Sequence, residues 1–151
     1  MRLLFLGSGG IALPSLEWLI ATPQHELVGV ITQPDKPAGR KLELTPPQTK
    51  VIAQAAGIPV LQPPRIKLAI DEVKAFAADV IVVFAYGQIL PKAVLEAPRL
   101  AIINLHTSLL PRHRGASPIQ AAIRDGDVES GVMRGAQAAY PFNREYVYRG
   151  A

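Results

Sequence analysis

The sequence predicts an α/β fold, a doubly wound and mostly parallel sheet with helices on both faces. Several apolar segments run without polar interruption, which is typical of parallel strands buried on both sides. Segments with apolar residues at helical spacing lie between them, so each strand is expected to lead into a crossover helix. The 151 residues fit one domain with a core large enough to fold alone.

The predicted strands and helices alternate along the chain. The strands are expected at residues 2–7, 27–32, 80–84 and 101–105. The helices are expected at residues 14–21, 45–56 and 66–76. Pro14 suits a first helical turn because its missing N–H has no partner there, and Thr45 is the expected N-cap, with Pro46 at the next position. Ligands of such sheets bind beyond the carboxyl ends of the strands.

Residues 33–41 read Gln-Pro-Asp-Lys-Pro-Ala-Gly-Arg-Lys, and we expect them to form neither helix nor strand. They follow the second predicted strand directly, at the edge where loops carry function. Lys36, Arg40 and Lys41 give this loop its positive charge. Charge alone fits a phosphate-binding loop and a solvated basic loop equally well.

Composition excludes several classes of function. Of the net charge of +4, residues 1–133 carry +2, from 13 Lys and Arg against 11 Asp and Glu, which gives no broad surface for DNA. The absence of cysteine excludes disulfides, thiolate metal sites and cysteine nucleophiles. No apolar run approaches the roughly 18 residues of a membrane span. We therefore expect a cytoplasmic protein with no membrane, DNA or metal partner.

Residues 134–151 differ in composition from the rest. They hold three of the four tyrosines and no Asp, Leu or Ile, and they show no clear period. One interpretation is an irregular terminal segment whose aromatic residues pack on the body. The other is that the sequence native to this domain stops near Met133 and unrelated sequence follows.

A glycine-rich turn follows the first predicted strand. Residues 7–12 match Gly-x-Gly-x-x-Ala between a strand and a helix, the pattern of dinucleotide-binding turns. That pattern also requires an acidic residue at the end of the second strand, but Asp35 lies beyond Pro34. A nicotinamide-dinucleotide-binding module and a simple tight turn both remain open.

A second pattern lies at the end of the strand predicted over residues 101–105. Asn104 and His106 are two residues apart, so on a strand their side chains share one face. An amide donor beside an imidazole suits acyl transfer, because the two can stabilise an oxyanion and move protons. The alternative is that the pair only hydrogen-bonds to loop backbone.

Three motifs together resemble a known family. They are Phe-Ala-Tyr-Gly-x-x-Leu-Pro at 84–91, Asn-Leu-His-x-Ser-Leu-Leu-Pro-x-x-Arg-Gly at 104–115 and Pro-Asp-Lys-Pro-Ala-Gly-Arg at 34–40. Over residues 1–133 the chain is similar to the N-terminal domain of the methionyl-tRNA formyltransferases, within the folate-dependent formyltransferase superfamily. The resemblance implies a Rossmann-like formyltransferase domain, incomplete at its C-terminus.

The resemblance also implies a reaction, in which a formyl group passes from 10-formyltetrahydrofolate to the amino group of initiator methionyl-tRNA. It makes Asn104 and His106 the catalytic pair and assigns tRNA contacts to Lys36, Arg40 and Lys41. The residues it assigns to the folate are Phe84, Tyr86, Gly87, Ile89, Leu90, Ser108, Leu109, Leu110 and Pro111. The alternatives within the superfamily are glycinamide ribonucleotide formyltransferase and formyltetrahydrofolate hydrolase.

The chain departs from the family pattern after Met133. The family has an aspartate shortly downstream that holds the histidine in its charged form, but residues 134–151 contain no Asp, and Asp125 and Asp127 belong to the preceding turn. We also expect the family's C-terminal tRNA-binding β-barrel to be absent. We therefore expect impaired turnover from this chain. His25 and His113 are expected at the surface.

Overall fold

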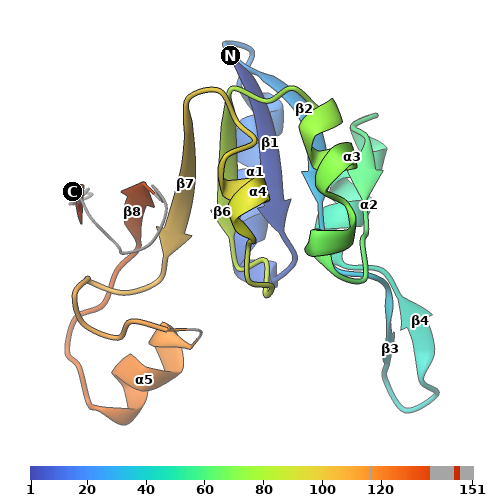
Figure 1. Ribbon diagram of the computed structural model, residues 1–151. Coiled ribbons are helices and arrows are strands. Elements are labelled where there is room, and N and C mark those ends of the chain that lie inside the picture. Colours follow the sequence, from blue (N-terminus) through green and yellow to red (C-terminus); the bar gives the residue numbers. More distant parts are fainter. Residues whose placement is uncertain (116, 137–144, 147–151) are drawn as a thin grey trace.

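The computed structural model describes residues 1–115, 117–136 and 145–146, with residues 134–136 and 145–146 described through their backbone alone. These form a sheet in the order β5-β2-β1-β6-β7-β8-β9 (Figure 1). Its strands are β1 (Arg2–Gly7), β2 (Glu26–Ile31), β5 (Val60–Leu61), β6 (Val80–Phe84), β7 (Ala101–His106), β8 (Met133–Ala136) and β9 (Glu145–Tyr146). The first five strands in this order are parallel, and β8 and β9 join antiparallel.

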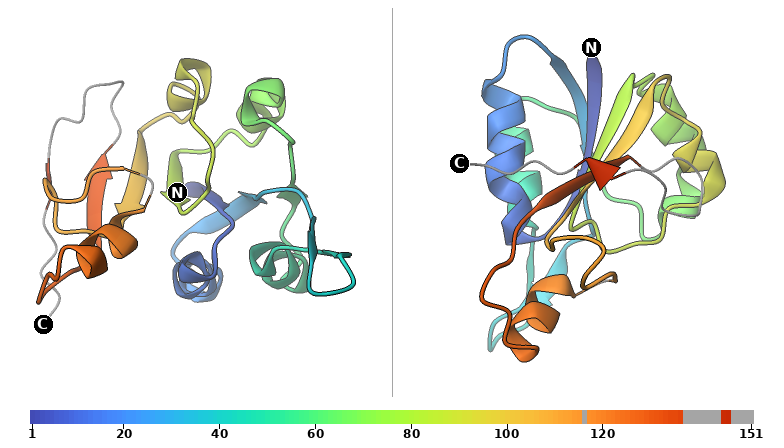
Figure 2. Two further views of the ribbon diagram at one scale, coloured as in Figure 1. Left: turned by 90° about the horizontal axis from the view of Figure 1, so that it is seen from below. Right: turned by 90° about the vertical axis from the view of Figure 1, so that its left-hand side faces the viewer.

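Helices cover both faces of the sheet, so the predicted doubly wound α/β fold is confirmed. The helical elements are η1 (Gly10–Ala12), α1 (Leu13–Ala21), α2 (Gln48–Ala55), η2 (Ile66–Leu68), α3 (Ile70–Ala75), α4 (Lys92–Leu95) and α5 (Pro118–Arg124). Seen along the strands, α1 and α2 lie on one face and α3 and α4 on the other (Figure 2). Helix α5 lies beyond the carboxyl ends of the strands (Figure 1).

The central strand β1 shows why its sequence is apolar without a break. Leu4 and Leu6 pack into the core cluster that contains Ile66 and Val73, beneath η2 and α3. Leu3 and Phe5 point the other way, into the cluster that contains Leu16 of α1. Successive strand residues face opposite sides of a sheet, so a strand covered on both sides has no position for a polar side chain.

The expected N-cap at Thr45 is wrong, and the helix there starts later. Helix α2 begins at Gln48 with Pro47 as its N-cap, and Thr45 ends a strand. A residue before proline is disfavoured in helical geometry. Because Thr45 and Pro46 each precede a proline, both are held extended, and Pro47 has a ψ of 140°.

The basic segment expected to be a loop contains a strand. β3 (Lys36–Ala38) pairs antiparallel with β4 (Glu43–Thr45), with Lys36 opposite Thr45. The chain reverses through Gly39 and Leu42, which have φ values of 70° and 50°. All residues from 36 to 45 are exposed, and the hairpin projects beyond the carboxyl ends of the parallel strands (Figure 1).

Two other expectations need correction. The helix predicted over residues 66–76 is divided into η2 and α3 at Ala69, which leaves helical geometry with φ −124° and ψ 30°. The tail expected to be irregular is regular at residues 134–136 and 145–146, which belong to β8 and β9. Residues 137–144 and 147–151, and with them Tyr140 and Tyr148, lie outside the described residues.

Gly29 in β2 provides a test of the packing between sheet and helix. A Cβ atom at this position would overlap the Phe76 ring, with Cδ1 only 2.8 Å away, whereas a Cβ at Gly10 would meet nothing within 4 Å. We expect Gly29→Ala to lower the free energy of unfolding by about 1–3 kcal/mol through overpacking. Gly10→Ala should change it by less than about 0.5 kcal/mol. Urea unfolding followed by circular dichroism measures both, and equal losses would contradict this packing.

Candidate active site

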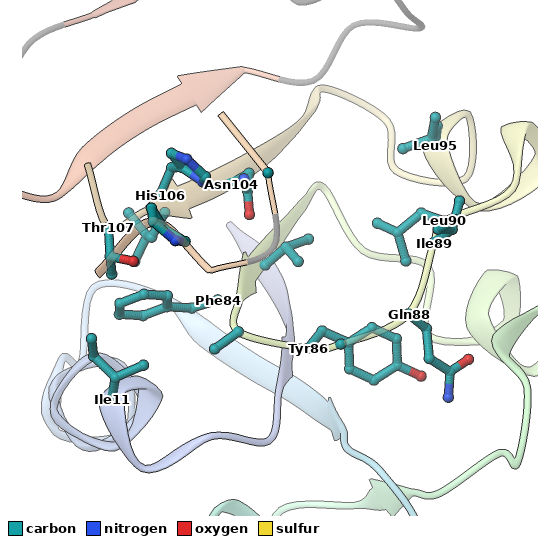
Figure 3. A pocket seen from close by; sticks show the side chains of 16 residues that line it. Ile11, Phe84, Tyr86, Gln88, Ile89, Leu90, Leu95, Asn104, His106 and Thr107 are labelled. Atoms are coloured by element: carbon teal, nitrogen blue, oxygen red, sulfur yellow. The ribbon is translucent and has the colours of Figure 1, made fainter. Parts of the chain in front are cut away.

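A pocket of about 490 Å³ opens at the carboxyl ends of β6 and β7 (Figure 3). Open α/β sheets bind ligands at this edge. The lining residues come from η1, from the end of β6 and the segment that follows it, from the last residue of α4, from the end of β7 and the segment that follows it, and from the start of α5. They are Ile11, Val83, Phe84, Ala85, Tyr86, Gly87, Gln88, Ile89, Leu90, Leu95, Asn104, Leu105, His106, Thr107, Gly115 and Pro118.

Asn104 and His106 both line this pocket, and their half-buried side chains lie next to each other in Figure 3. The intervening Leu105 packs on the cluster beneath α1, on the other face of the sheet. The shared face expected from their spacing is therefore present. The strand ends at His106, so both side chains reach the pocket rim. Asn104 is paired with β6 on one side and β8 on the other, and His106 is paired with Met133 of β8.

Two side chains that bind carbonyl oxygens fix the turn after β7, one from the end of the strand and one from within the turn. The His106 ring nitrogen Nε2 lies 3.1 Å from the carbonyl oxygen of His113. Because a carbonyl only accepts, Nε2 carries the proton in this arrangement. The Ser108 hydroxyl donates to the carbonyl of Arg112 at 2.8 Å.

The residues expected to contact the folate fall into two groups. Phe84, Tyr86, Gly87, Ile89 and Leu90 line the pocket. The other four, Ser108, Leu109, Leu110 and Pro111, are absent from its lining.

The turn itself explains why the second group does not line the pocket. Ser108 is fully buried and its hydroxyl is used by Arg112. The Leu110 N–H faces the sulfur of Met133 at 2.8 Å, and a Cβ at Gly131 would lie 2.9 Å from Leu109 Cδ2. Leu110 and Leu109 therefore lie against Met133 and Gly131, Ser108 is bonded within the turn, and Pro111 is exposed.

Tyr86 is a buried aromatic residue in the pocket wall. Its residue exposure is 2%, and its hydroxyl has no hydrogen-bond partner among the described residues. Burial raises the pKa of Tyr86 to about 12, so the phenol stays protonated at neutral pH. The Tyr86 carbonyl accepts a hydrogen bond from the Gln33 side chain at 2.9 Å, which ties this wall to the end of β2.

His113 is a member of a charged cluster, so its expected surface position is wrong. Its side chain is only 9% exposed, and Nε2 lies 2.5 Å from Asp127 Oδ2. Arg112 also pairs with Asp127, and Asp125 lies 3.7 Å from His113 Nδ1. The hydrogen bond from His113 and the charge of Arg112 hold the pKa of Asp127 below its usual value. The consecutive basic residues at 112–114 indicate a charged cluster in the sequence, but their acidic partner Asp127 lies 14 residues downstream of His113.

A chain of hydrogen-bonded hydroxyl groups holds the glycine-rich turn in place. Thr49 donates to the Gly7 carbonyl at 3.1 Å, Thr32 lies 2.9 Å from Thr49, and Ser8 lies 3.0 Å from Thr32. The Gln33 N–H then donates to Ser8 Oγ at 2.8 Å. The Ser8 hydroxyl therefore joins the ends of β1 and β2.

Asp35 is held at the base of the basic hairpin. Lys50 Nζ lies 2.8 Å and 2.9 Å from its two carboxylate oxygens, and Gln62 donates to Oδ1 at 2.7 Å. Those hydrogen bonds, with the Lys50 one strongest, keep the pKa of Asp35 below its usual value. This carboxylate is engaged within the protein, which disfavours the ribose-binding role that a nicotinamide module would give an acidic residue here.

The described residues contain neither a membrane-spanning helix nor a metal cluster. No helix there is both long and apolar enough to cross a bilayer. No group of three or more His, Asp or Glu side chains in those ranges has the arrangement of a metal site.

Comparison with known proteins decides the family. The formyl transferase family model matches residues 1–134. The chain belongs to the formyl transferase family. A methionyl-tRNA formyltransferase from Synechococcus sp. is 53% identical over 137 residues, and one from Bdellovibrio bacteriovorus is 50% identical over 135. Each match covers 87% of this chain and 42% of the relative, so the chain spans about two-fifths of the length of these relatives.

Solved structures agree with the Rossmann-like fold of this chain. Glycinamide ribonucleotide transformylase 1 from Geobacillus kaustophilus matches with a TM-score of 0.75 and 20% identity, over 98% of this chain and 80% of that one. A phosphoribosylglycinamide formyltransferase from Anaplasma phagocytophilum matches with a TM-score of 0.70 and 21% identity, over 91% and 64%. At this identity the likeness concerns the fold alone.

The carboxylates with lowered pKa predict how the protein responds to acid. In Asp35, Asp79 and Asp127 the folded-state pKa lies below the unfolded value of about 3.9. The cause at Asp79 is the Arg2 backbone N–H, which donates to its carboxylate at 2.9 Å, together with the charge of Arg99 at 2.7 Å. Their stabilisation is therefore complete above that value and is lost as pH falls through the folded-state pKa. Urea midpoints should fall from pH 6 toward pH 3, and Asp35→Asn should reduce that fall. Asp71→Asn, at an exposed position of α3, is the control, and an equal reduction by both variants would argue against the Lys50 pairing.

Proposed function

We propose that this chain carries the formyl-transfer site for 10-formyltetrahydrofolate and initiator methionyl-tRNA, in the cytoplasm. The proposal rests on one observation, that Asn104 and His106 lie side by side at the rim of an apolar pocket. The methionyl-tRNA formyltransferases that match 87% of this chain at about half identity support the choice of acceptor.

The proposed reaction needs donors to an oxyanion more than it needs a nucleophile from the protein. The methionyl amine forms an amide bond to the formyl carbon, and the bond from that carbon to N10 of the folate breaks. The amine loses one proton and N10 gains one, which yields formylmethionyl-tRNA and tetrahydrofolate. Negative charge builds on the formyl oxygen, and the Asn104 amide and the His106 ring are the groups we assign to stabilise it.

The pocket wall suits the donor's ring system. Phe84 and Leu90 supply apolar surface, while the backbone around Gly87, which has a φ of 84°, offers N–H and carbonyl groups. Such a combination of apolar walls and a few convergent polar groups is usual for cofactor-sized ligands. Ile89, with 95% of its surface exposed, lies at the rim, where a bound ligand would cover it.

The basic hairpin is the part we assign to the tRNA. Lys36, Arg40 and Lys41 are all exposed on β3 and the turn that follows it. The hairpin projects beyond the carboxyl ends of the parallel strands (Figure 1), and the pocket is lined by residues at the ends of β6 and β7, so an RNA end held by the hairpin is directed toward that edge. Three cations alone give weak, salt-sensitive binding.

A different acceptor is the second candidate function. The solved structures with the same fold include glycinamide ribonucleotide transformylases. A phosphate-binding turn would have to use residues 7–10, where the Ser8 hydroxyl is already bonded to Thr32 and Gln33. Parallel assays with methionyl-tRNA and glycinamide ribonucleotide, each with 10-formyltetrahydrofolate, separate the two acceptors.

Removal of either proposed catalytic side chain should slow the chemical step. We expect Asn104→Ala and His106→Ala each to lower the transfer rate about 100-fold to 1,000-fold, because each deletes an oxyanion donor. Folate affinity should change much less, since the ground-state formyl oxygen carries little charge. Single-turnover transfer and calorimetry with a stable 10-formyl folate analogue measure the two effects. His25→Ala, outside the pocket lining, is the control, and a fully active His106→Ala protein would falsify the assignment.

Charge removal on the hairpin should weaken RNA binding in proportion to the number of phosphates released. Arg40→Ala and Lys41→Ala should each reduce the slope of log K against log salt by about 1. Titration of a tRNA acceptor stem from about 50 to 200 mM salt, the range in which phosphate pairing strongly affects affinity, gives the slopes. The exposed Lys67 of η2 is the matched control. If Lys67→Ala changes the slope as much as Arg40→Ala, the hairpin has no special role.

A further inference from the structure

The end of helix α5 places a carboxylate close to the turn after β7. Gly126 has a φ of 70°, its N–H donates to the Ile123 carbonyl at 3.2 Å, and the Asp127 N–H donates to the Ala122 carbonyl at 3.0 Å. These are the two hydrogen bonds of a Schellman motif, in which glycine takes the left-handed position. The motif fixes the backbone of Asp127, so its carboxylate has a defined position.

Asp127 uses that position to hold the ring of His113. The two side chains are 2.5 Å apart at Nε2 and Oδ2 and are nearly buried, with exposures of 9% and 7%. Asp125 lies 3.7 Å from the other ring nitrogen, but it is 42% exposed and also pairs with Arg124. Asp127 is therefore the stronger restraint on the ring.

His113 in turn presents its carbonyl oxygen to His106. Its φ is 52°, in the left-handed region that residues other than glycine adopt only when their surroundings hold them there. In this conformation the His113 carbonyl lies 3.1 Å from His106 Nε2. The ring that Asp127 fixes and the carbonyl that His106 contacts thus belong to one strained residue.

We propose that Asp127 and His113 are positioning residues that set the tautomer of His106. Asp127 holds the His113 ring, and the His113 carbonyl then requires the proton of His106 to be on Nε2. Nδ1 is left as the nitrogen that acts in the pocket, as a lone pair in neutral imidazole and as a second donor in imidazolium. This inference rests on the proposed function only for the consequence that Nδ1 acts on the substrate.

Spectroscopy of the ring nitrogens tests this directly in the 151-residue chain. Nitrogen-15 NMR at a pH about two units above the ordinary imidazole pKa of about 6.5 distinguishes the two neutral tautomers. The three histidines are assigned by single substitution. We expect His106 to be in the Nε2–H form, and Asp127→Asn to shift it toward a tautomeric mixture. The formyl-transfer rate of that variant should fall about 10-fold to 100-fold, the usual effect of losing a group that orients another, with folate affinity unchanged.

Asp125→Asn is the matched control, since it removes the same charge beside the same ring but at 3.7 Å. It should leave both the His106 nitrogen signals and the rate unchanged. If Asp127→Asn does not fold, His113→Asn replaces it, because asparagine accepts a left-handed φ but lacks the ring that reaches Asp127.

The outcomes separate this inference from the proposed function. Unchanged His106 nitrogen signals in a folded Asp127→Asn or His113→Asn protein overturn the positioning role, whatever the activity. A shifted tautomer together with a His106→Ala protein of parental activity supports the positioning role and overturns the assigned catalysis.

Discussion

Three parallel strands in register determine where everything else in the molecule lies. Residues 3–7 of β1 pair one to one with residues 80–84 of β6, and these pair in turn with residues 101–105 of β7. The three strands therefore end at one level, and the segments that follow them meet. Ser8 and Gly9 donate to the Ala85 carbonyl across that edge, and the pocket opens beside them. A shift of one residue in β7 would move Asn104 and His106 to the opposite face, because strand side chains alternate.

Polar side chains that bind backbone carbonyls fix the segments that follow these strands. Thr49 binds the Gly7 carbonyl, Gln33 binds that of Tyr86, and His106 and Ser108 each bind a carbonyl in the following turn. Each bond fixes a loop by its main chain, so the neighbouring side chains remain available to a ligand. The rim of the pocket is thus shaped by backbone positions that side chains elsewhere hold in place.

The sequence predicts the four long parallel strands closely, since β1 and β6 match their expected bounds, β7 differs by one residue and β2 is shifted by one residue. Burial on both faces requires an unbroken run of apolar residues, and such a run is visible in the sequence of each strand alone. Prediction from local sequence misplaces the start of α2. Thr45 is a good N-cap in isolation, but the two prolines after it hold the chain extended. Such prediction also misses β3, whose partner begins only after the turn at Gly39.

The candidate site shows the same division between local and distant information. The spacing of Asn104 and His106 is local, and their shared face follows from it. The pairing of His113 with Asp127 joins residues on either side of α5, and the basic residues at 112–114 do not indicate which carboxylate is their partner. Residues 108–111 have the composition of an apolar wall, yet Leu109 and Leu110 lie against Gly131 and Met133.

Within the part of the chain that the structure describes, the basic hairpin is joined to the rest of the protein at its base, through Asp35, Lys50 and Gln62. Its two strands are exposed along their whole length, and Leu42 and Leu44 are each more than 70% exposed. Substitutions within residues 36–45 of this hairpin therefore alter neither the hydrophobic core nor the pocket wall. Evolution and protein engineering can thus vary the sequence of this hairpin independently of Asn104 and His106 at the end of β7.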